Sequence, residues 1–177
     1  MATKLEQVDL VLKRFRDYVV QQSRSNLTKG DKNVSKDLYK SIDGEFISED
    51  NFSIVGFSML EYGQFIDQGV RGKSSSTKAP NSPFKFGSGS GQKGGLTKGI
   101  KKWVQARRFQ FRDAKSGKFM SYEQTAFLIS RSIFHKGIKA SLFFTKPFEA
   151  GYKKYIDVDL IKAFGQDVET MVDYNLK

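Results

Sequence analysis

Residues 45–57 read EFISEDNFSIVGF, two short runs of strand-forming residues on either side of the turn-forming residues 49–51. In 52–57 one set of positions, Phe52, Ile54 and Gly56, alternates with a second, Ser53, Val55 and Phe57, which is the period of two expected of a strand. The pattern therefore predicts an antiparallel β-hairpin with strands over 45–48 and 52–57.

An amphipathic helix is expected before this hairpin, over residues 3–24. Its apolar residues recur at steps of three and four, which is the helical period; they are Leu5, Val8, Leu12, Phe15 and Val19, with Val11 and Tyr18 widening the stripe. Thr3 and Glu6 have the spacing of a capping box. Residues 34–42 suit either a short helix or the entry to a strand.

Four further segments follow the hairpin. Residues 60–68 predict a short helix closed by Gly69, and 97–109 predict a basic helix. Ser121 and Gln124 have capping-box spacing and open a helix that runs to 135 and ends at Gly137. Residues 143–148 form a short aromatic segment interrupted by a proline.

The last predicted helix spans residues 158–174. Its expected buried face is Ile161, Phe164, Val168 and Met171. Asp157 and Asp159 are expected near its positive N-terminal end. Together the segments predict a single α+β domain over 1–177, with long N- and C-terminal helices packed on a small antiparallel sheet, a long Gly-rich basic loop and inserted helices.

The charge is concentrated in one part of the chain. The 177 residues carry 30 Lys and Arg against 19 Asp and Glu, a net charge of +11. Residues 70–120 hold 13 of the basic residues and a single acid, Asp113, whereas 1–69 and 121–177 are nearly neutral. A basic run can be no more than a solvated face, but such a charge also suits nucleic acid, an anionic membrane or an acidic protein partner.

The first part of this basic segment has the composition of a loop. Residues 72–95 contain six glycines, two prolines and three consecutive serines, which disfavour a helix or an inner strand. We therefore expect residues 70–96 to form a flexible basic arm. The candidate partner- or DNA-facing residues are Arg71, Lys73, Lys78, Lys85, Lys93, Lys98, Lys101, Lys102, Arg107, Arg108 and Arg112.

Composition argues against several kinds of chemistry. The chain has no cysteine and a single histidine, which excludes disulfides, thiolate sites and His-rich metal sites. The Gly-rich run 87–93 lacks the glycine-lysine-Ser/Thr spacing of a phosphate loop. We predict no catalytic, cofactor-binding or metal-binding residues, and neither a secretion signal nor a membrane-spanning helix is expected.

Aromatic residues are also abundant, with 16 Phe and 7 Tyr. Several lie in or near the basic segment, at positions 84, 86, 103, 109, 111 and 119. Basic residues interleaved with aromatic rings can form a platform for single-stranded nucleic acid. The alternative, which we favour, is that these rings form core and subunit contacts.

Three motifs occur in an order that resembles a known family. Leu-Tyr-Lys-Ser-Ile at 38–42 precedes the hairpin, and Glu-Tyr-Gly-Gln-Phe-Ile-Asp-Gln-Gly at 61–69 follows it. Phe-Thr-Lys-Pro-Phe-Glu-Ala at 144–150 precedes the last helix. This order resembles the tailed-bacteriophage neck proteins of the head–tail joining, or tail-completion, family. The matching positions are Tyr62, Phe65, Asp67, Gly69, Pro147 and Phe148. The family has Glu where this chain has Asp67 and Ala at position 63, and the long arm and the helices between 97 and 135 depart from its pattern.

The resemblance implies a structural virion protein, not an enzyme. Its expected place is the head–tail interface of the virion, after assembly in the host cytoplasm. It would form a sixfold ring with copies of itself between the connector or adaptor and the tail-tube or terminator proteins. The basic arm would dock on an acidic neighbouring ring or face the genome in the channel, and no membrane is involved. The alternative function is a basic nucleic-acid-binding accessory protein. A small nuclease is a third, but it requires clustered carboxylates that the sequence does not show.

Overall fold

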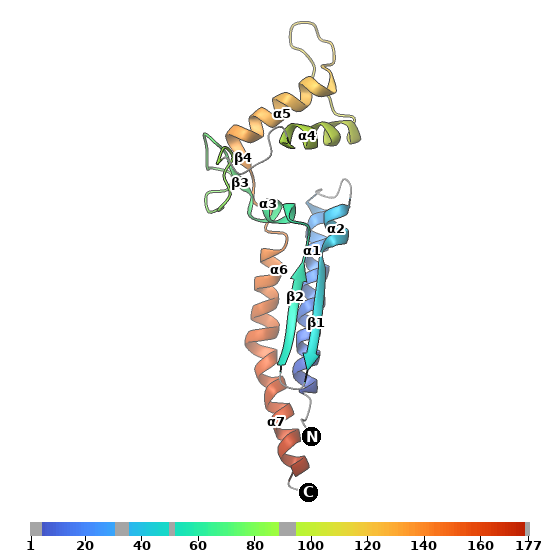
Figure 1. Ribbon diagram of the computed structural model, residues 1–177, viewed down its shortest axis with the longest axis vertical. Helices are drawn as coiled ribbons and strands as arrows, with labels where there is room; N and C mark the ends of the chain where they lie inside the picture. The colour runs from blue at the N-terminus through green and yellow to red at the C-terminus, as the bar shows by residue number, and fades with distance from the viewer. Residues whose placement is uncertain (1–4, 31–35, 50–51, 89–94, 176–177) are drawn as a thin grey trace. The chain divides into compact units, whose positions relative to one another are not determined.

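The computed structural model describes residues 5–30, 36–49, 52–88 and 95–175 (Figure 1). The protein has an α+β fold in which long N- and C-terminal helices pack on a small two-stranded antiparallel sheet, as the sequence predicts. Two compact units make up the chain: unit 1 is residues 1–63 and 142–177, and unit 2 is residues 64–141. The single domain expected from the sequence stays a prediction.

Helix α1 (Glu6–Lys29) is the central element of unit 1. Its predicted stripe is confirmed, because Val8, Val11, Phe15 and Val19 are all buried, and the helix runs five residues beyond the predicted end. Thr3, the predicted capping residue, lies outside the described residues. The residue at the N-cap position is Leu5, whose side chain makes no capping hydrogen bond.

The predicted hairpin is confirmed as strands β1 (Asp43–Glu49) and β2 (Phe52–Ser58), which follow the short helix α2 (Asp37–Ser41). The turn residues 50–51 lie outside the described part of the chain. One face of the hairpin packs on α1 through polar as well as apolar side chains. The buried carboxylate of Asp9 accepts hydrogen bonds from the hydroxyls of Ser48, at 2.7 Å, and Ser53, at 2.6 Å. Because the two serines lie on different strands, Asp9 ties both to α1.

The C-terminal helix starts earlier than the sequence predicts. It consists of α6 (Thr145–Gly151), a π-helical segment η1 (Tyr152–Leu160) and α7 (Ile161–Asn175). Pro147, expected to interrupt this region, is the third residue of α6, where a missing N–H costs little. Asp157 and Asp159 therefore lie within the π-helical segment, and their prediction as helix-start residues is wrong.

The predicted buried face of the last helix is also wrong. Ile161 is 70% exposed and Phe164 is 53% exposed. The side turned towards α1 carries Ala163 and Asp167, both buried. Ala163 packs with the small apolar residues of α1, and the carboxylate of Asp167 accepts hydrogen bonds from two backbone N–H groups of α1. Because of these contacts, the side of α7 that is buried is the one with Ala163 and Asp167, and the neighbouring, more hydrophobic side stays exposed.

Rings from three elements meet in the middle of unit 1. Phe15 of α1 contacts Phe57 of β2 at 5.8 Å and Phe148 of α6 at 5.6 Å between ring centroids, both edge to face. A Cβ at Gly151 would lie 3.0–3.1 Å from the rings of Tyr18 and Phe15, so glycine lets the helices approach closely. This cluster holds α1, the hairpin and the C-terminal helix together.

Unit 2 contains helices α4 (Gly95–Ala106) and α5 (Tyr122–Lys136), and strands β3 (Val70–Arg71) and β4 (Gly137–Ile138), which pair antiparallel. Helix α3 (Tyr62–Gln68) precedes β3 and ends at Gly69, whose φ is +73°, as predicted. The Ser121–Gln124 capping box is present, and Gly137 (φ +82°) ends α5.

Residues 72–88 connect β3 towards α4 and hydrogen-bond to the rest of unit 2. The N–H of Lys73 donates to the carbonyl of Phe134 at 2.8 Å, and the N–H of Phe86 donates to the carbonyl of Arg71 at 2.9 Å. The remainder of the expected arm, 89–94, lies outside the described residues. The flexibility of the arm stays a prediction.

Candidate interaction surfaces

The division into units coincides with a division of charge. Unit 2 contains 16 Lys and Arg against three Asp and Glu, a net charge of +13. Unit 1 contains 14 basic and 16 acidic residues, a net charge of −2. The basic segment 70–120 expected from the sequence thus makes up most of a folded unit with its own helices, and it extends beyond the Gly-rich loop.

The structure distributes the candidate basic residues over several elements of unit 2. Arg71 lies in β3, and the loop 72–88 carries Lys73, Lys78 and Lys85. Helix α4 carries Lys98, Lys101 and Lys102, and its end is followed by Arg107 and Arg108. Arg112 pairs with Phe119 in a β-bridge, and Lys93 lies outside the described residues. Lys101 forms an ion pair with Glu123 of α5, at 2.5 Å, so it also links the two helices. A hydrogen bond from Lys101 is the main reason why the pKa of Glu123 lies below its usual value.

Three aromatic rings cluster at the end of α4. Phe109 lies 6.3 Å from Trp103 and 5.2 Å from Phe111 between ring centroids. All three rings remain about 40% exposed, and Arg107 and Arg108 are exposed beside them in sequence. We call these five residues the aromatic–basic surface. It is open to solvent, so the rings are available for contact with a partner.

The hairpin presents a second exposed surface, on the side away from α1. Ile47 pairs with Ile54 across the strands, and both are about half exposed, as is Phe52. Glu45 and Glu49 are two residues before and after Ile47 on the same face, and both are exposed. We call these five residues the hairpin face. Neither strand contains Lys or Arg, so the charge around this apolar centre is acidic.

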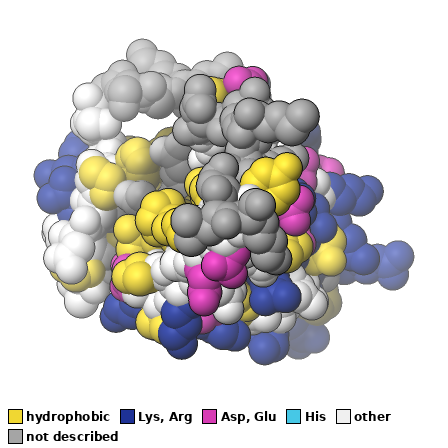
Figure 2. Space-filling view, turned by 90° about the horizontal axis from the view of Figure 1, so that it is seen from below, with side chains coloured by type: hydrophobic (Ala, Val, Ile, Leu, Met, Phe, Trp, Pro, Cys, Tyr) yellow, Lys and Arg dark blue, Asp and Glu magenta, His cyan; other side chains and the backbone are white. Residues whose placement is uncertain are grey.

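A third surface is the exposed stripe of α7. Ile161, Phe164, Val168 and Val172 recur at steps of three and four, and each is between 39% and 70% exposed. Figure 2 views the molecule from the end that holds the termini and shows hydrophobic side chains open to solvent among charged ones. Exposed apolar areas of this kind are typical of surfaces that a partner covers.

The sequence analysis identified neither the hairpin face nor the stripe of α7 as an exposed surface. The hairpin face could have been found from the period of two, since Glu45, Ile47 and Glu49 share one side of any strand. The alternation does not say which side meets the helix. The stripe of α7 was found but assigned to the interior.

The residues that carry the family resemblance have mainly structural positions. Asp67 is 3% exposed, and its backbone carbonyl accepts a hydrogen bond from the N–H of Ser141 at 3.0 Å. A Cβ at Gly69 would lie 2.6 Å from backbone atoms of Ile138 and Ala140, so only glycine fits. Pro147 is buried in the first turn of α6.

The aromatic members of the motifs are more accessible. Phe148 belongs to the ring cluster of unit 1, whereas Phe65 is 43% exposed and contacts Phe84 edge to face at 4.6 Å. Tyr62 is 42% exposed, and its partial burial, followed by the charge of Asp37, raises the pKa of its hydroxyl. The six motif positions are divided between the units: Tyr62, Pro147 and Phe148 belong to unit 1, whereas Phe65, Asp67 and Gly69 belong to unit 2.

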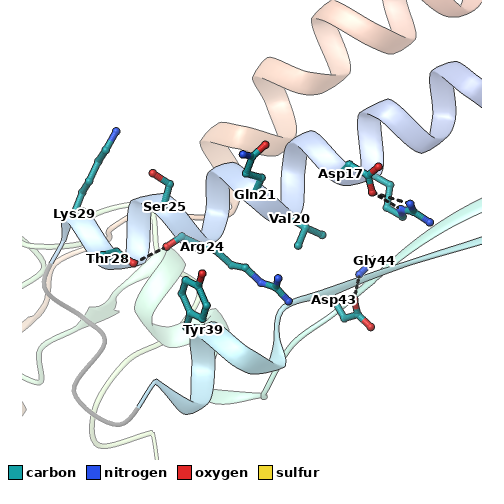
Figure 3. Close-up of a pocket in the computed structure, with 11 residues that line it drawn as sticks. Asp17, Val20, Gln21, Arg24, Ser25, Thr28, Lys29, Tyr39, Asp43 and Gly44 are labelled. Carbon is teal, nitrogen blue, oxygen red and sulfur yellow. Dashed lines mark hydrogen bonds and ion pairs between the residues drawn. The ribbon is translucent and has the colours of Figure 1, made fainter.

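A groove of about 880 Å³ lies in unit 1 between α1 and the segment that contains α2 and the start of β1 (Figure 3). Arg24 extends into it over the ring of Tyr39, with 5.5 Å from the guanidinium carbon to the ring centroid, and donates a hydrogen bond to the carbonyl of Ile42 at 2.7 Å. Arg16 and Asp17 form an ion pair at 2.7 Å nearby. Arg24 thus holds α2 and the hairpin against α1.

Within the described ranges, no three Asp, Glu or His side chains lie close enough together to hold a metal ion. No helix in the same ranges combines the length and the apolar character that crossing a membrane requires. A scan against models of protein families, a search of curated proteins and a search of solved structures each gave no match. The family resemblance therefore stays a prediction from the motifs.

Proposed function

We propose that this protein is a structural component of the neck of a tailed bacteriophage, where several copies form a ring that joins the head to the tail. The observation that supports this most is that unit 1 leaves two apolar surfaces uncovered, the hairpin face and the stripe of α7. A protein that acts as an isolated monomer gains nothing from such surfaces, whereas a subunit buries them against its neighbours.

The motif residues add support because of what they do in the fold. Asp67, Gly69 and Pro147 are buried or sterically constrained, and Phe148 joins α6 to α1 and β2. Structural roles of this kind are expected of motifs that specify a shared fold. The exposed surfaces indicate only that copies of the chain assemble, and the resemblance to the neck proteins is what identifies the assembly as a phage neck.

The test has two parts. Native mass spectrometry of the purified protein at increasing concentration should show a closed oligomer, and a hexamer is the expected species. Electron microscopy of virions with antibody labelling should place the protein at the head–tail junction in several copies. A protein that stays monomeric and is absent from virions contradicts the proposal.

A second candidate is a nucleic-acid-binding accessory protein, favoured by the aromatic–basic surface. Exposed rings beside arginines can stack on bases while the charges contact phosphates. Binding of this kind weakens steeply with salt. Retention of single-stranded DNA at low ionic strength that is lost by a few hundred millimolar salt would support it, and no retention at low salt would contradict it.

A further inference from the structure

We propose that neighbouring copies of this chain contact each other head to tail, with the hairpin face of one copy on the aromatic–basic surface of the next. The inference rests on the proposed function in one respect, namely that several copies assemble. It adds which surfaces meet, and so it predicts which substitutions block assembly and which combinations restore it.

The two surfaces match in apolar character. The hairpin face offers Ile47, Phe52 and Ile54, each about half exposed. The aromatic–basic surface offers Trp103 and Phe109, each about 40% exposed, together with Phe111. Aliphatic side chains packed on exposed aromatic rings are a common centre of a protein interface.

The charges at the edges of the two surfaces are opposite. Glu45 and Glu49 flank the apolar centre of the hairpin face, and the strands contain no cation. Arg107 and Arg108 lie at the other surface, in a unit with a net charge of +13. Opposite charges at the rim orient two partners and speed their association.

Charge also explains why a second copy is a better occupant than the alternatives. Two hairpin faces would bring four glutamates together, and two aromatic–basic surfaces would bring four arginines together. Nucleic acid would suit the aromatic–basic surface but would leave the hairpin face uncovered and would be repelled by it. A second copy satisfies both surfaces with one kind of contact, which is the heterologous arrangement that closes into rings.

The experiment uses paired charge reversals in the full chain. The hairpin variant is Glu45→Lys with Glu49→Lys, and the arginine variant is Arg107→Glu with Arg108→Glu. A single exposed ion pair contributes little, but each variant replaces attraction by repulsion at two positions, so each should assemble about 10-fold or more weakly than the natural chain. Sedimentation velocity measures assembly, and circular dichroism confirms that each variant folds.

Matched controls reverse the same number of charges elsewhere in each unit. Glu149→Lys with Asp157→Lys alters exposed residues of α6 and η1, and Arg131→Glu with Lys139→Glu alters exposed residues of unit 2 that are not among the candidate partner-facing ones. Both controls should assemble within about twofold of the natural chain, because net charge alone has a weak effect at physiological salt.

Mixing separates contacts between copies from contacts within one. The hairpin variant has two cationic surfaces and the arginine variant has two anionic ones, so an equimolar mixture should assemble with alternating copies. A chain that carries both reversals should assemble by itself. If the two surfaces met within one chain, mixing would restore nothing.

Three results overturn the proposal. They are assembly of both variants at the strength of the natural chain, a mixture no better than its components, and a natural chain that stays monomeric at about 100 μM, where a contact with a dissociation constant of about 1 μM would be almost fully formed. In the first two cases a ring at the head–tail junction would still stand, built on other surfaces. Loss of DNA retention by the arginine variant with unchanged assembly would assign that surface to nucleic acid.

Discussion

Asp167 supplies the cap that α1 lacks, and removing it should destabilise unit 1. Its side chain is 6% exposed, and its two carboxylate oxygens accept hydrogen bonds from the backbone N–H groups of Gln7, at 3.1 Å, and Val8, at 3.0 Å. Leu5, at the N-cap position, has no side chain that could do this. A residue of α7 thus satisfies free donors in the first turn of α1 that lie 160 and 159 residues earlier in the chain.

The size of the effect follows from these two contacts. Replacing a capping side chain by alanine costs about 0.5–2 kcal/mol, and a hydrogen bond to a charged group contributes about 1.5–3 kcal/mol. The two estimates describe the same contacts and are not summed, and Gln7 is exposed enough for water to replace one bond. We expect Asp167→Ala to lower the free energy of unfolding by about 2–3 kcal/mol, and Asp167→Asn by about half as much, because one acceptor oxygen remains.

Urea unfolding followed by circular dichroism measures the loss, with Asp173→Ala as the control. Asp173 is an exposed acid on the same helix, and its replacement should change the free energy by less than about 0.5 kcal/mol. Hydrogen exchange supplies the local readout, since the amides of Gln7 and Val8 should exchange faster in Asp167→Ala. Equal losses for the two variants, or unchanged exchange at those amides, would refute the cap.

Other predictions concern single features of the two units. Replacing both Ser48 and Ser53 by alanine strips the buried carboxylate of Asp9 of its two hydroxyl donors and should cost about 2–4 kcal/mol in a denaturation curve, with each single replacement costing about half. Gly69→Ala should lower the thermal midpoint of unfolding by several degrees, because φ is +73° and the added Cβ would clash with backbone. Hydrogen bonds from the N–H and hydroxyl of Ser116 and the N–H of Lys115 lower the pKa of Asp113. The stabilisation that the Asp113 carboxylate gives to the turn 113–116 should therefore be complete at neutral pH and should be lost as the pH falls through the lowered pKa. A carboxyl NMR titration can follow this loss, and a pKa of Asp113 above its usual value would contradict the prediction. Ile161→Gln should leave the stability of the monomer within about 0.5 kcal/mol, because this side chain is 70% exposed; a larger loss would show that the stripe of α7 is packed.

The sequence predicted those elements whose signals are local. The stripe of α1, the Ser121–Gln124 capping box and the glycines that end α3 and α5 each depend on residues within a few positions of one another. The hairpin depends on alternation over six residues and a turn. Such signals are sufficient because the same residues that form the pattern also make the contacts.

The C-terminal helix could not be predicted in the same way. Its period is disturbed by the nine-residue π-helical segment, which rotates α7 relative to the helix before it. Which stripe of α7 is buried is decided by long-range partners, namely the N–H groups of Gln7 and Val8 and the small surface of Val8 and Val11 opposite Ala163. Hydrophobicity favours the neighbouring stripe, and only the fold shows that a polar residue, Asp167, faces inward.

Only part of the candidate surfaces could be predicted from the sequence. The excess of basic residues between 70 and 120 was evident, but not that unit 2 folds as a compact unit with a net charge of +13. The clustering of Trp103, Phe109 and Phe111 required the turn at Arg108, where φ is +50°, to bring the end of α4 back on itself. The acidic hairpin face required knowledge of which side α1 covers.

The separation of charge also bears on how a chain with uncovered apolar surfaces would avoid unspecific aggregation. A net charge of +11 keeps copies apart at long range. At short range, contacts between like surfaces bring like charges together, which disfavours symmetric pairs built on the hairpin face or on the aromatic–basic surface. The head-to-tail contact is the pairing of these two surfaces in which apolar burial and charge act in the same direction. Repulsion would thus contribute as much to the choice of assembly as attraction does, and this is why reversing the charges of both surfaces in one chain should preserve the assembly that reversing either one removes.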